Sequence, residues 1–134
     1  RPQDLSLAMQ KEWSDRLPAS TTKEYVHIAN VLNNRKYFSE EAYAVIAELL
    51  ETIMENPANR QWLKHAGMKG GSTLFVLTKT LYATLKNGDR IELSYFFNDL
   101  SPVENEMLQH WMNSFELSVL SSPRFRDTLA ATFK

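Results

Sequence analysis

The chain has no cysteine among its 134 residues, which excludes disulfide bonds and thiolate metal sites and leaves the redox compartment open. It has no excess of either charge sign, since 15 Lys and Arg oppose 16 Asp and Glu. It also has no apolar run long enough to span a bilayer, and its polar first residues, Arg1 to Asp4, lack the apolar core of a signal peptide. These absences predict no nucleic-acid partner and no membrane span in this chain. They favour a small-molecule or peptide ligand.

The composition is that of a soluble globular protein, with 43% hydrophobic and 23% charged residues. No internal repeat or linker divides the chain. We therefore expect a single α+β domain that is helical over residues 1–66, has strands over 67–99 and ends in helices over 101–133.

Capping residues mark the helices of the first half. Thr21 followed by Glu24 is the pattern of a capping box, and Ser39 before two glutamates is an N-cap. Asn56-Pro57 has the pattern of a third helix start. We expect helices over about 5–13, 22–32 and 39–53, then a short one through Trp62 to Gly67. The second helix should end at Asn33-Asn34, and its apolar face consists of Tyr25, Ile28, Ala29 and Leu32. The apolar face of the third consists of Ala42, Val45, Ile46, Leu49, Leu50 and Ile53.

The middle of the chain changes to a period near two. Thr80–Leu85 and Ile91–Phe97 are rich in β-forming residues. Asn87-Gly88-Asp89 lies between them and favours a tight turn, because asparagine and glycine tolerate positive φ. These segments predict antiparallel strands.

Two Ser-Pro pairs predict the C-terminal helices. Ser101 begins a long helix, with Glu104 completing a capping box. Ser122 begins a shorter helix through Phe125 and Leu129. We expect the long helix to turn one row of apolar residues inward: Val103, Met107, Trp111 and Phe115.

The most informative segment is Gly67–Thr73, where Lys69 precedes two glycines at the change from helices to strands. A backbone without side chains lets a ligand lie against it. The alternative interpretation is a flexible turn without any ligand.

The segment that follows Lys69, the Asn-Gly-Asp turn, the strand ending in Tyr95-Phe96-Phe97 and the helix from Ser101 together resemble the C-terminal part of the class A β-lactamase and penicillin-binding transpeptidase family. The resemblance covers the chain from about Ser20 onward. It implies a three-stranded antiparallel meander packed with helices, and a periplasmic or extracellular location.

The resemblance also assigns roles to individual residues. Lys69 matches the lysine of the family's Lys-Thr-Gly motif and would hold the substrate carboxylate, and Ser72 matches the position whose backbone N–H forms half of the oxyanion hole. Gly70 and Gly71 would form the substrate-binding strand. Gly70 departs from the motif because it lacks the usual hydroxyl, which Ser72 or Thr73 would have to replace.

The family's nucleophile belongs to a Ser-x-x-Lys pair, and Ser20-Thr21-Thr22-Lys23 has that spelling. We interpret it as a plain helix start, because too few residues precede Ser20 and too few separate it from Lys69 for the lobe that carries the family's Ser-x-Asn motif. Ser14-Asp15-Arg16 lacks the asparagine and precedes Ser20. The expected function is therefore the C-terminal portion of a serine hydrolase acting through an acyl-enzyme on an amide, lactam or ester, with the nucleophile on an upstream segment.

The other candidate side chains have structural interpretations. The three histidines, His27, His65 and His110, lie on separate predicted helices without a second ligand at metal spacing, so neither a metal nor another cofactor is expected. Most of the aromatic residues sit at core spacing. The competing function is a non-catalytic α+β module that binds a partner or a cell-wall peptide. The expected substrate is a small molecule or peptide of the β-lactam or D-alanyl peptide type, and the expected partner is the missing N-terminal half or a second copy.

Overall fold

The computed structural model describes residues 5–133, so the polar lead-in expected at residues 1–4 lies outside the described residues. The elements follow one another as α1 (Leu7–Asp15), α2 (Thr22–Asn34), α3 (Glu40–Leu50), the 3₁₀ turns η1 (Thr52–Glu55) and η2 (Asn59–Gln61), β1 (Leu63–Ser72), β2 (Leu77–Leu85), β3 (Arg90–Phe97), α4 (Pro102–Ser121) and α5 (Pro123–Thr132). The three strands form one antiparallel sheet in the order β1-β2-β3. The predicted α+β class and the antiparallel meander are confirmed.

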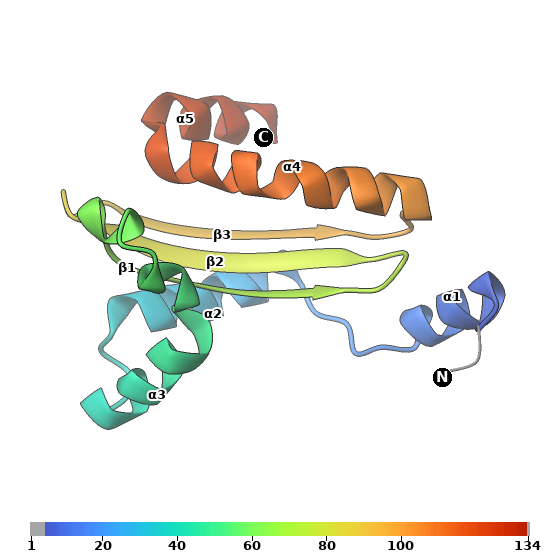
Figure 1. Cartoon of the computed structure of the whole chain (residues 1–134), viewed down its shortest axis with the longest axis horizontal. Coiled ribbons are helices and arrows are strands. Elements are labelled where there is room, and N and C mark those ends of the chain that lie inside the picture. The colour runs from blue at the N-terminus through green and yellow to red at the C-terminus, as the bar shows by residue number, and fades with distance from the viewer. Residues whose placement is uncertain (1–4, 134) are drawn as a thin grey trace.

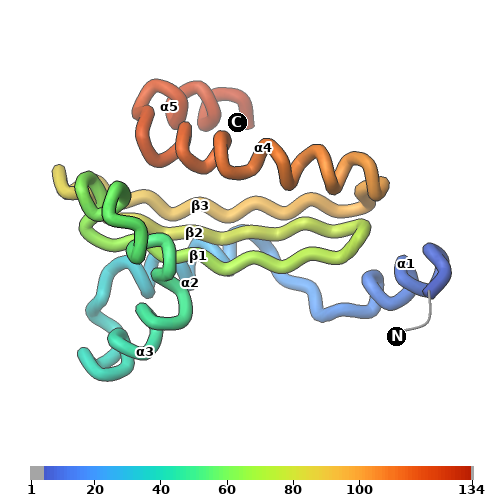
Figure 2. Tube along the Cα trace, viewed as in Figure 1, coloured from blue at the N-terminus to red at the C-terminus, as the bar shows by residue number. Residues whose placement is uncertain are grey.

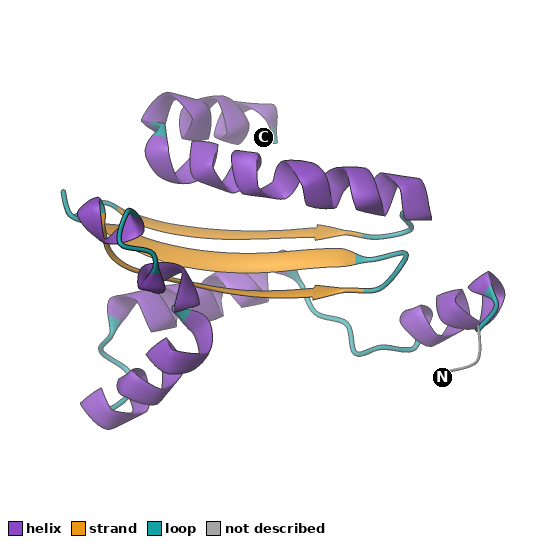
Figure 3. Ribbon diagram, in the orientation of Figure 1, coloured by secondary structure: helices purple, strands orange, loops and turns teal. Residues whose placement is uncertain are grey.

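Helices lie on both faces of the sheet (Figure 1). α4 and α5 cover one face, where Glu116 of α4 pairs with Lys79 of β2. α2 packs against β2 and β3 on the other face. α1 lies beyond the end of the strands and is joined to α2 by an extended segment (Figure 2). The loops between the remaining elements are short (Figure 3), so the strand ends are held closely.

The predicted helix starts are confirmed at Thr21, Ser39, Ser101 and Ser122, each of which accepts a backbone hydrogen bond as an N-cap. Thr21 and Ser101 form complete capping boxes with Glu24 and Glu104. The β2–β3 turn also forms as expected, with Gly88 at φ +97°. These are local interactions, which a short stretch of sequence is sufficient to specify.

The helix expected through Trp62 to Gly67 is wrong, because β1 already begins at Leu63. Gly67 lies in the middle of this strand and pairs with Tyr82. The β1 sequence is poor in β-branched residues, so its extended conformation depends on pairing with β2 and on burial of Leu63 and Ala66.

The break expected at Asn33-Asn34 is also wrong. α2 continues through Asn34 and ends where Arg35 adopts left-handed φ of 54°. Asn33 is buried, and its amide donates to the Ala83 carbonyl at 3.0 Å and to the Glu92 carboxylate at 2.7 Å. Bonds to the sheet therefore hold asparagine within the helix.

The predicted inward row of α4 is mostly wrong. Val103, Met107 and Trp111 are 72%, 56% and 62% exposed, and only Phe115 packs against the core. The helix instead buries Asn105 in its first half and Glu116, Val119 and Leu120 in its second. The polar Asn105 binds the carbonyls of Thr73 and Leu74, which orients the helix about its own axis.

The inner faces of α2 and α3 also differ from the expected ones. Tyr25, Ile28, Val45 and Leu49 are exposed. α3 instead buries Tyr43, whose hydroxyl donates to the Val31 carbonyl at 3.2 Å. The compact core is formed by Leu63, Ala66, Leu81, Ala83, Ile91, Val119 and Leu120.

Across residues 5–133, none of the helices combines the length and the apolar character that a bilayer crossing requires.

Candidate functional site at the glycine-rich strand edge

The glycine-rich half of β1 lies on an open edge of the sheet, because β1 pairs with β2 alone. The Thr73 N–H donates to the Val76 carbonyl at 2.9 Å, so Thr73 and Val76 form a hydrogen-bonded pair at the start of the β1–β2 ladder. This pair determines which residues of β1 point their backbone groups toward β2. In an antiparallel pair every second residue turns its N–H and C=O away from the partner strand. Gly70 and Ser72 therefore present their backbone N–H and C=O groups to the free edge.

The register separates the predicted site residues between two faces of the sheet. Lys69 and Gly71 are opposite Thr80 and Thr78 and lie on the face covered by α2. Gly70 and Ser72 lie on the face covered by α4, and Thr73 begins the turn to β2. The strand edge itself, rather than either face, brings the predicted site residues together.

Lys69 is exposed, and its ammonium donates to the Gly70 carbonyl at 2.9 Å. This places a cation on the rim of the free edge, beside the outward N–H groups. Lys69 lines neither of the two cavities at this end of the sheet.

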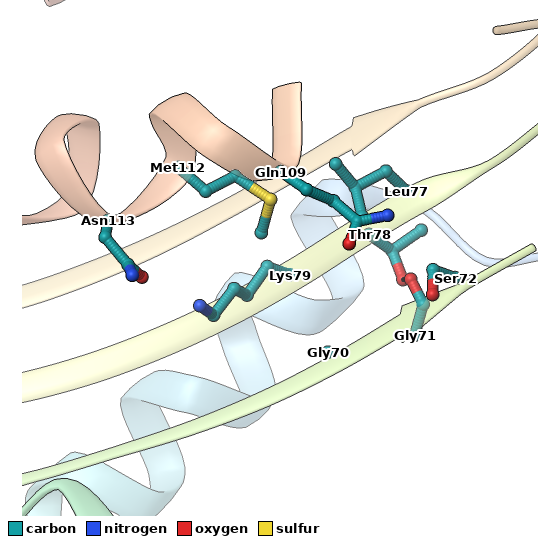
Figure 4. Close-up of a pocket in the computed structure, with 9 residues that line it drawn as sticks. All are labelled: Gly70, Gly71, Ser72, Leu77, Thr78, Lys79, Gln109, Met112 and Asn113. Carbon is teal, nitrogen blue, oxygen red and sulfur yellow. Dashed lines mark hydrogen bonds between the residues drawn. The ribbon is translucent and has the colours of Figure 1, made fainter. Parts of the chain in front are cut away.

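The first cavity, of about 480 Å³, lies between the strand ends and α4 (Figure 4). The strands contribute Ser72, Thr78 and Lys79 together with the bare backbone of Gly70 and Gly71. α4 contributes Gln109, Met112 and Asn113, which point from the helix toward the strands. The lining combines the apolar side chains of Leu77 and Met112 with polar groups that can form hydrogen bonds.

Lys79 is held in this cavity wall by a buried ion pair. Its ammonium lies 3.0 Å from the Glu116 carboxylate, and the two side chains are 14% and 7% exposed. The Tyr95 hydroxyl donates to the same carboxylate. Burial, together with this bond to Glu116, raises the pKa of Tyr95 well above its ordinary value, so Tyr95 stays a neutral donor.

The second cavity, of about 570 Å³, lies between residues 14–20 and the ends of the strands. It brings Ser14 and Ser20 to the same cavity as Gly71, Ser72 and Thr73. Ser14 is only 6% exposed, and its hydroxyl lies 2.7 Å from that of Thr73. The Thr73 hydroxyl also accepts from the N–H groups of Phe75 and Val76, so it organises the turn.

The sequence interpretation missed Ser14, which was set aside because Ser14-Asp15-Arg16 precedes Ser20 and lacks an asparagine. The signal was present in the sequence as a serine followed by aspartate. Its proximity to Thr73, which is 59 residues away in the chain, is a tertiary contact.

Ser20 precedes the N-cap of α2, which is Thr21, and does not itself accept from the helix N–H groups. Its hydroxyl donates to the Glu24 carboxylate at 2.6 Å, within the capping box that begins α2. This bond is the main cause of the lowered pKa of Glu24. Among the hydrogen bonds of residues 5–133, none joins Ser20 to Lys23.

His65 lies on β1 ahead of its glycine-rich half, whereas His27 lies on α2 and His110 on α4, and none of the three lines either cavity. His65 of β1 bonds through Nε2 to the Asn33 side-chain oxygen at 2.8 Å, and burial lowers its pKa. No group of three potential metal-ligating side chains occurs within residues 5–133.

Comparison of the chain with protein-family models, with curated proteins and with solved structures finds no match in any of the three. The fold therefore defines the class of protein no further than α+β with a three-stranded antiparallel sheet. The site is defined by its geometry alone.

Proposed function

We propose that this chain forms the sheet-edge wall of a serine-hydrolase site of the β-lactamase or D-alanyl-D-alanine peptidase type. The observation that carries the proposal is the free edge of β1, where the outward N–H of Ser72 lies beside a lysine-bearing, side-chain-free strand. Lys69 would hold the substrate carboxylate, and Gly70, Gly71 and Thr73 would shape the strand on which the substrate lies. A periplasmic or extracellular location belongs to the same proposal.

The chemistry follows from these groups. A serine hydroxyl from a segment outside these residues would form a C–O bond to the amide, lactam or ester carbonyl. The serine's proton would pass to the leaving group as the C–N or ester C–O bond breaks. The Ser72 backbone N–H would stabilise the oxyanion. Such stabilisation by a preorganised donor is usually the largest single contribution to the rate of these reactions.

The Ser20 geometry supports an external nucleophile, since the hydroxyl of Ser20 is engaged with Glu24. Gly70 supplies no hydroxyl, and Thr73 directs its own toward Ser14 and the turn. Ser72 is therefore the better replacement for the motif hydroxyl.

A second candidate function is a non-catalytic module that binds a cell-wall peptide. The same free edge supports it, because an extended peptide can add to an unpaired strand through backbone hydrogen bonds. The two candidates differ only in whether a covalent bond forms.

The test is acylation by a fluorescent penicillin in the full-length protein that contains this chain, read by gel fluorescence and intact mass. We expect a covalent adduct outside these residues, and we expect Lys69→Ala to lower the acylation rate by about 10²–10³-fold. Lys64→Ala is the matched control, since Lys64 is an exposed lysine of the same strand.

Equal acylation rates in Lys69→Ala and the parent protein would remove Lys69 from the site. An adduct on Ser20 would show that the nucleophile lies within the chain. Absence of any adduct, with D-alanyl peptide binding retained at the β1 edge, would select the non-catalytic module.

A further inference from the structure

The departure from the family motif at Gly70 has a structural consequence on the α4 side of the sheet. Gly70 pairs with Lys79 across the ladder. A Cβ built at residue 70 would lie 3.8 Å from Lys79 Cγ, 4.0 Å from Lys79 Cδ and 3.3 Å from the Thr78 carbonyl oxygen. A side chain there would cover the stem of Lys79, whereas glycine leaves the cavity open beside it.

Most of the polar groups around this opening can donate a hydrogen bond, and the amides and hydroxyls among them can also accept one. The ammonium of Lys79 has three N–H groups; it lies 3.0 Å from each of the two Glu116 oxygens and donates to Oε2. One amide N–H of Gln109 is used by Asn105, which leaves the other free for a ligand. Asn113 is exposed, and the Ser72 N–H points to the adjoining edge.

The charge of the cavity is close to balanced. Glu116 neutralises Lys79 from behind, and none of the described residues that line the cavity carries a carboxylate. A cation would find no partner there. A second anion close to an already paired ammonium would gain less than it gains at an unpaired one.

We infer that the cavity between Gly70, Lys79 and α4 is a binding subsite for an uncharged, oxygen-bearing group of the ligand, such as a carboxamide or an amide carbonyl. It lies across β1 from Lys69, so the two lysines serve different parts of one ligand. Lys69 meets the charged end at the rim, and the cavity receives the uncharged amide. This inference deepens the proposed function and rests on it for the identity of the ligand.

The probes are acetamide and acetate, which each carry a single polar group and differ in whether that group is uncharged or charged. Each is titrated into the ¹⁵N-labelled chain at constant ionic strength. The side-chain NH₂ signals of Gln109 and Asn113 report on the cavity, and the backbone signals of Lys69 and Ser72 report on the strand edge. We expect saturable shifts of both side-chain amides with acetamide, at a dissociation constant several-fold below that for acetate.

Two variants localise the binding. Gly70→Thr places a side chain over the cavity mouth and should weaken the shifts at Gln109 and Asn113 tenfold or more. Lys64→Ala is the matched control, because Lys64 is an exposed residue of the same strand that lines neither cavity, and it should leave the shifts unchanged. Asn113→Ala removes one exposed donor without disturbing the core and should also weaken binding, which keeps the test decisive if Gly70→Thr does not fold.

Shifts confined to the strand edge, or tighter binding of acetate at Gln109 and Asn113, would overturn the subsite. Neither result would affect the penicillin acylation test, so the subsite and the proposed function can fail separately.

Discussion

At the scale of single residues, Gly67 shows how closely a tyrosine ring of one strand can pack against the neighbouring strand. A Cβ at this position would lie 2.5 Å from both Cζ and Oη of Tyr82. Tyr82 is 3% exposed, and its hydroxyl donates to Glu51 at 3.0 Å, so the ring has little freedom to move. Glycine is required at residue 67 because the tyrosine ring occupies the space of a side chain.

We expect Gly67→Ala to lower the free energy of unfolding by about 1–3 kcal/mol, since overpacking a buried contact costs that much. Urea denaturation of the chain measures the change. Gly71→Ala, whose Cβ would meet only the Thr78 hydroxyl at 3.3 Å, should stay within about 0.5 kcal/mol of the parent. Equal effects of the two substitutions would contradict the role of Tyr82.

At the scale of elements, a buried polar network joins α2 to the sheet. The Asn33 side-chain oxygen accepts from the Thr84 hydroxyl at 2.7 Å and from His65 Nε2 at 2.8 Å. Since Asn33 also donates to Ala83 and Glu92, this oxygen is the acceptor and His65 carries its proton on Nε2. The network positions the helix that covers the Lys69 face of the sheet.

This network predicts that the free energy of unfolding depends on pH. Burial lowers the pKa of His65 below its ordinary value of 6.5, and the positive charge of Arg35 acts in the same direction, whereas Glu51 opposes it. The unfolded chain then binds a proton at a higher pH than the folded chain does. The contribution of neutral His65 to the free energy of unfolding is therefore fully present above about pH 6.5, and it is lost as the pH falls from there toward the folded pKa of His65.

We expect the urea midpoint to decrease between pH 7 and pH 5.5 in the parent chain. His65→Gln retains a donor to Asn33 but cannot titrate, so this decrease should be smaller in the variant. An identical pH profile for the two proteins would mean that His65 has the same pKa in the folded and unfolded states.

At the scale of the whole molecule, apolar surface remains uncovered. Val103, Met107 and Trp111, here called the α4 stripe, lie one turn apart on one side of α4 and are all more than half exposed. The outer edge of β3 is unpaired as well. Exposed apolar surface and open strand edges favour association, either with a second copy or with another segment of the parent protein.

We expect the isolated chain to self-associate at micromolar concentrations, as measured by sedimentation velocity, and Trp111→Lys to weaken this association at least tenfold. Tyr37→Lys is the control, because Tyr37 is also exposed, at 75%, but lies in the α2–α3 loop. A chain that remains monomeric at all concentrations would exclude a homodimer through the α4 stripe.

Local chemistry allowed much of this fold to be predicted from sequence. The caps at Thr21, Ser39, Ser101 and Ser122 and the turn at Gly88 are fixed by side chains within three residues of the backbone that they serve. The helix starts, the β2–β3 hairpin and the α+β class followed from them. The glycine-rich segment after Lys69 was likewise identifiable, because glycine pairs next to strands are rare and conformationally distinctive.

Contacts between distant residues decided the rest. β1 has weak strand propensity of its own and becomes a strand only by pairing with β2, and the inner side of α4 is chosen by Asn105 and Glu116 rather than by its apolar row. The proximity of Ser14 to Thr73 and of Lys79 to Glu116 depends on how the elements pack. Sequence alone determined where four of the helices and the β2–β3 turn begin, and it singled out the glycine-rich segment proposed as the site. Only the tertiary structure decided which faces are buried and which side chains meet at the edge of β1, because burial and pairing depend on partners far away in the chain.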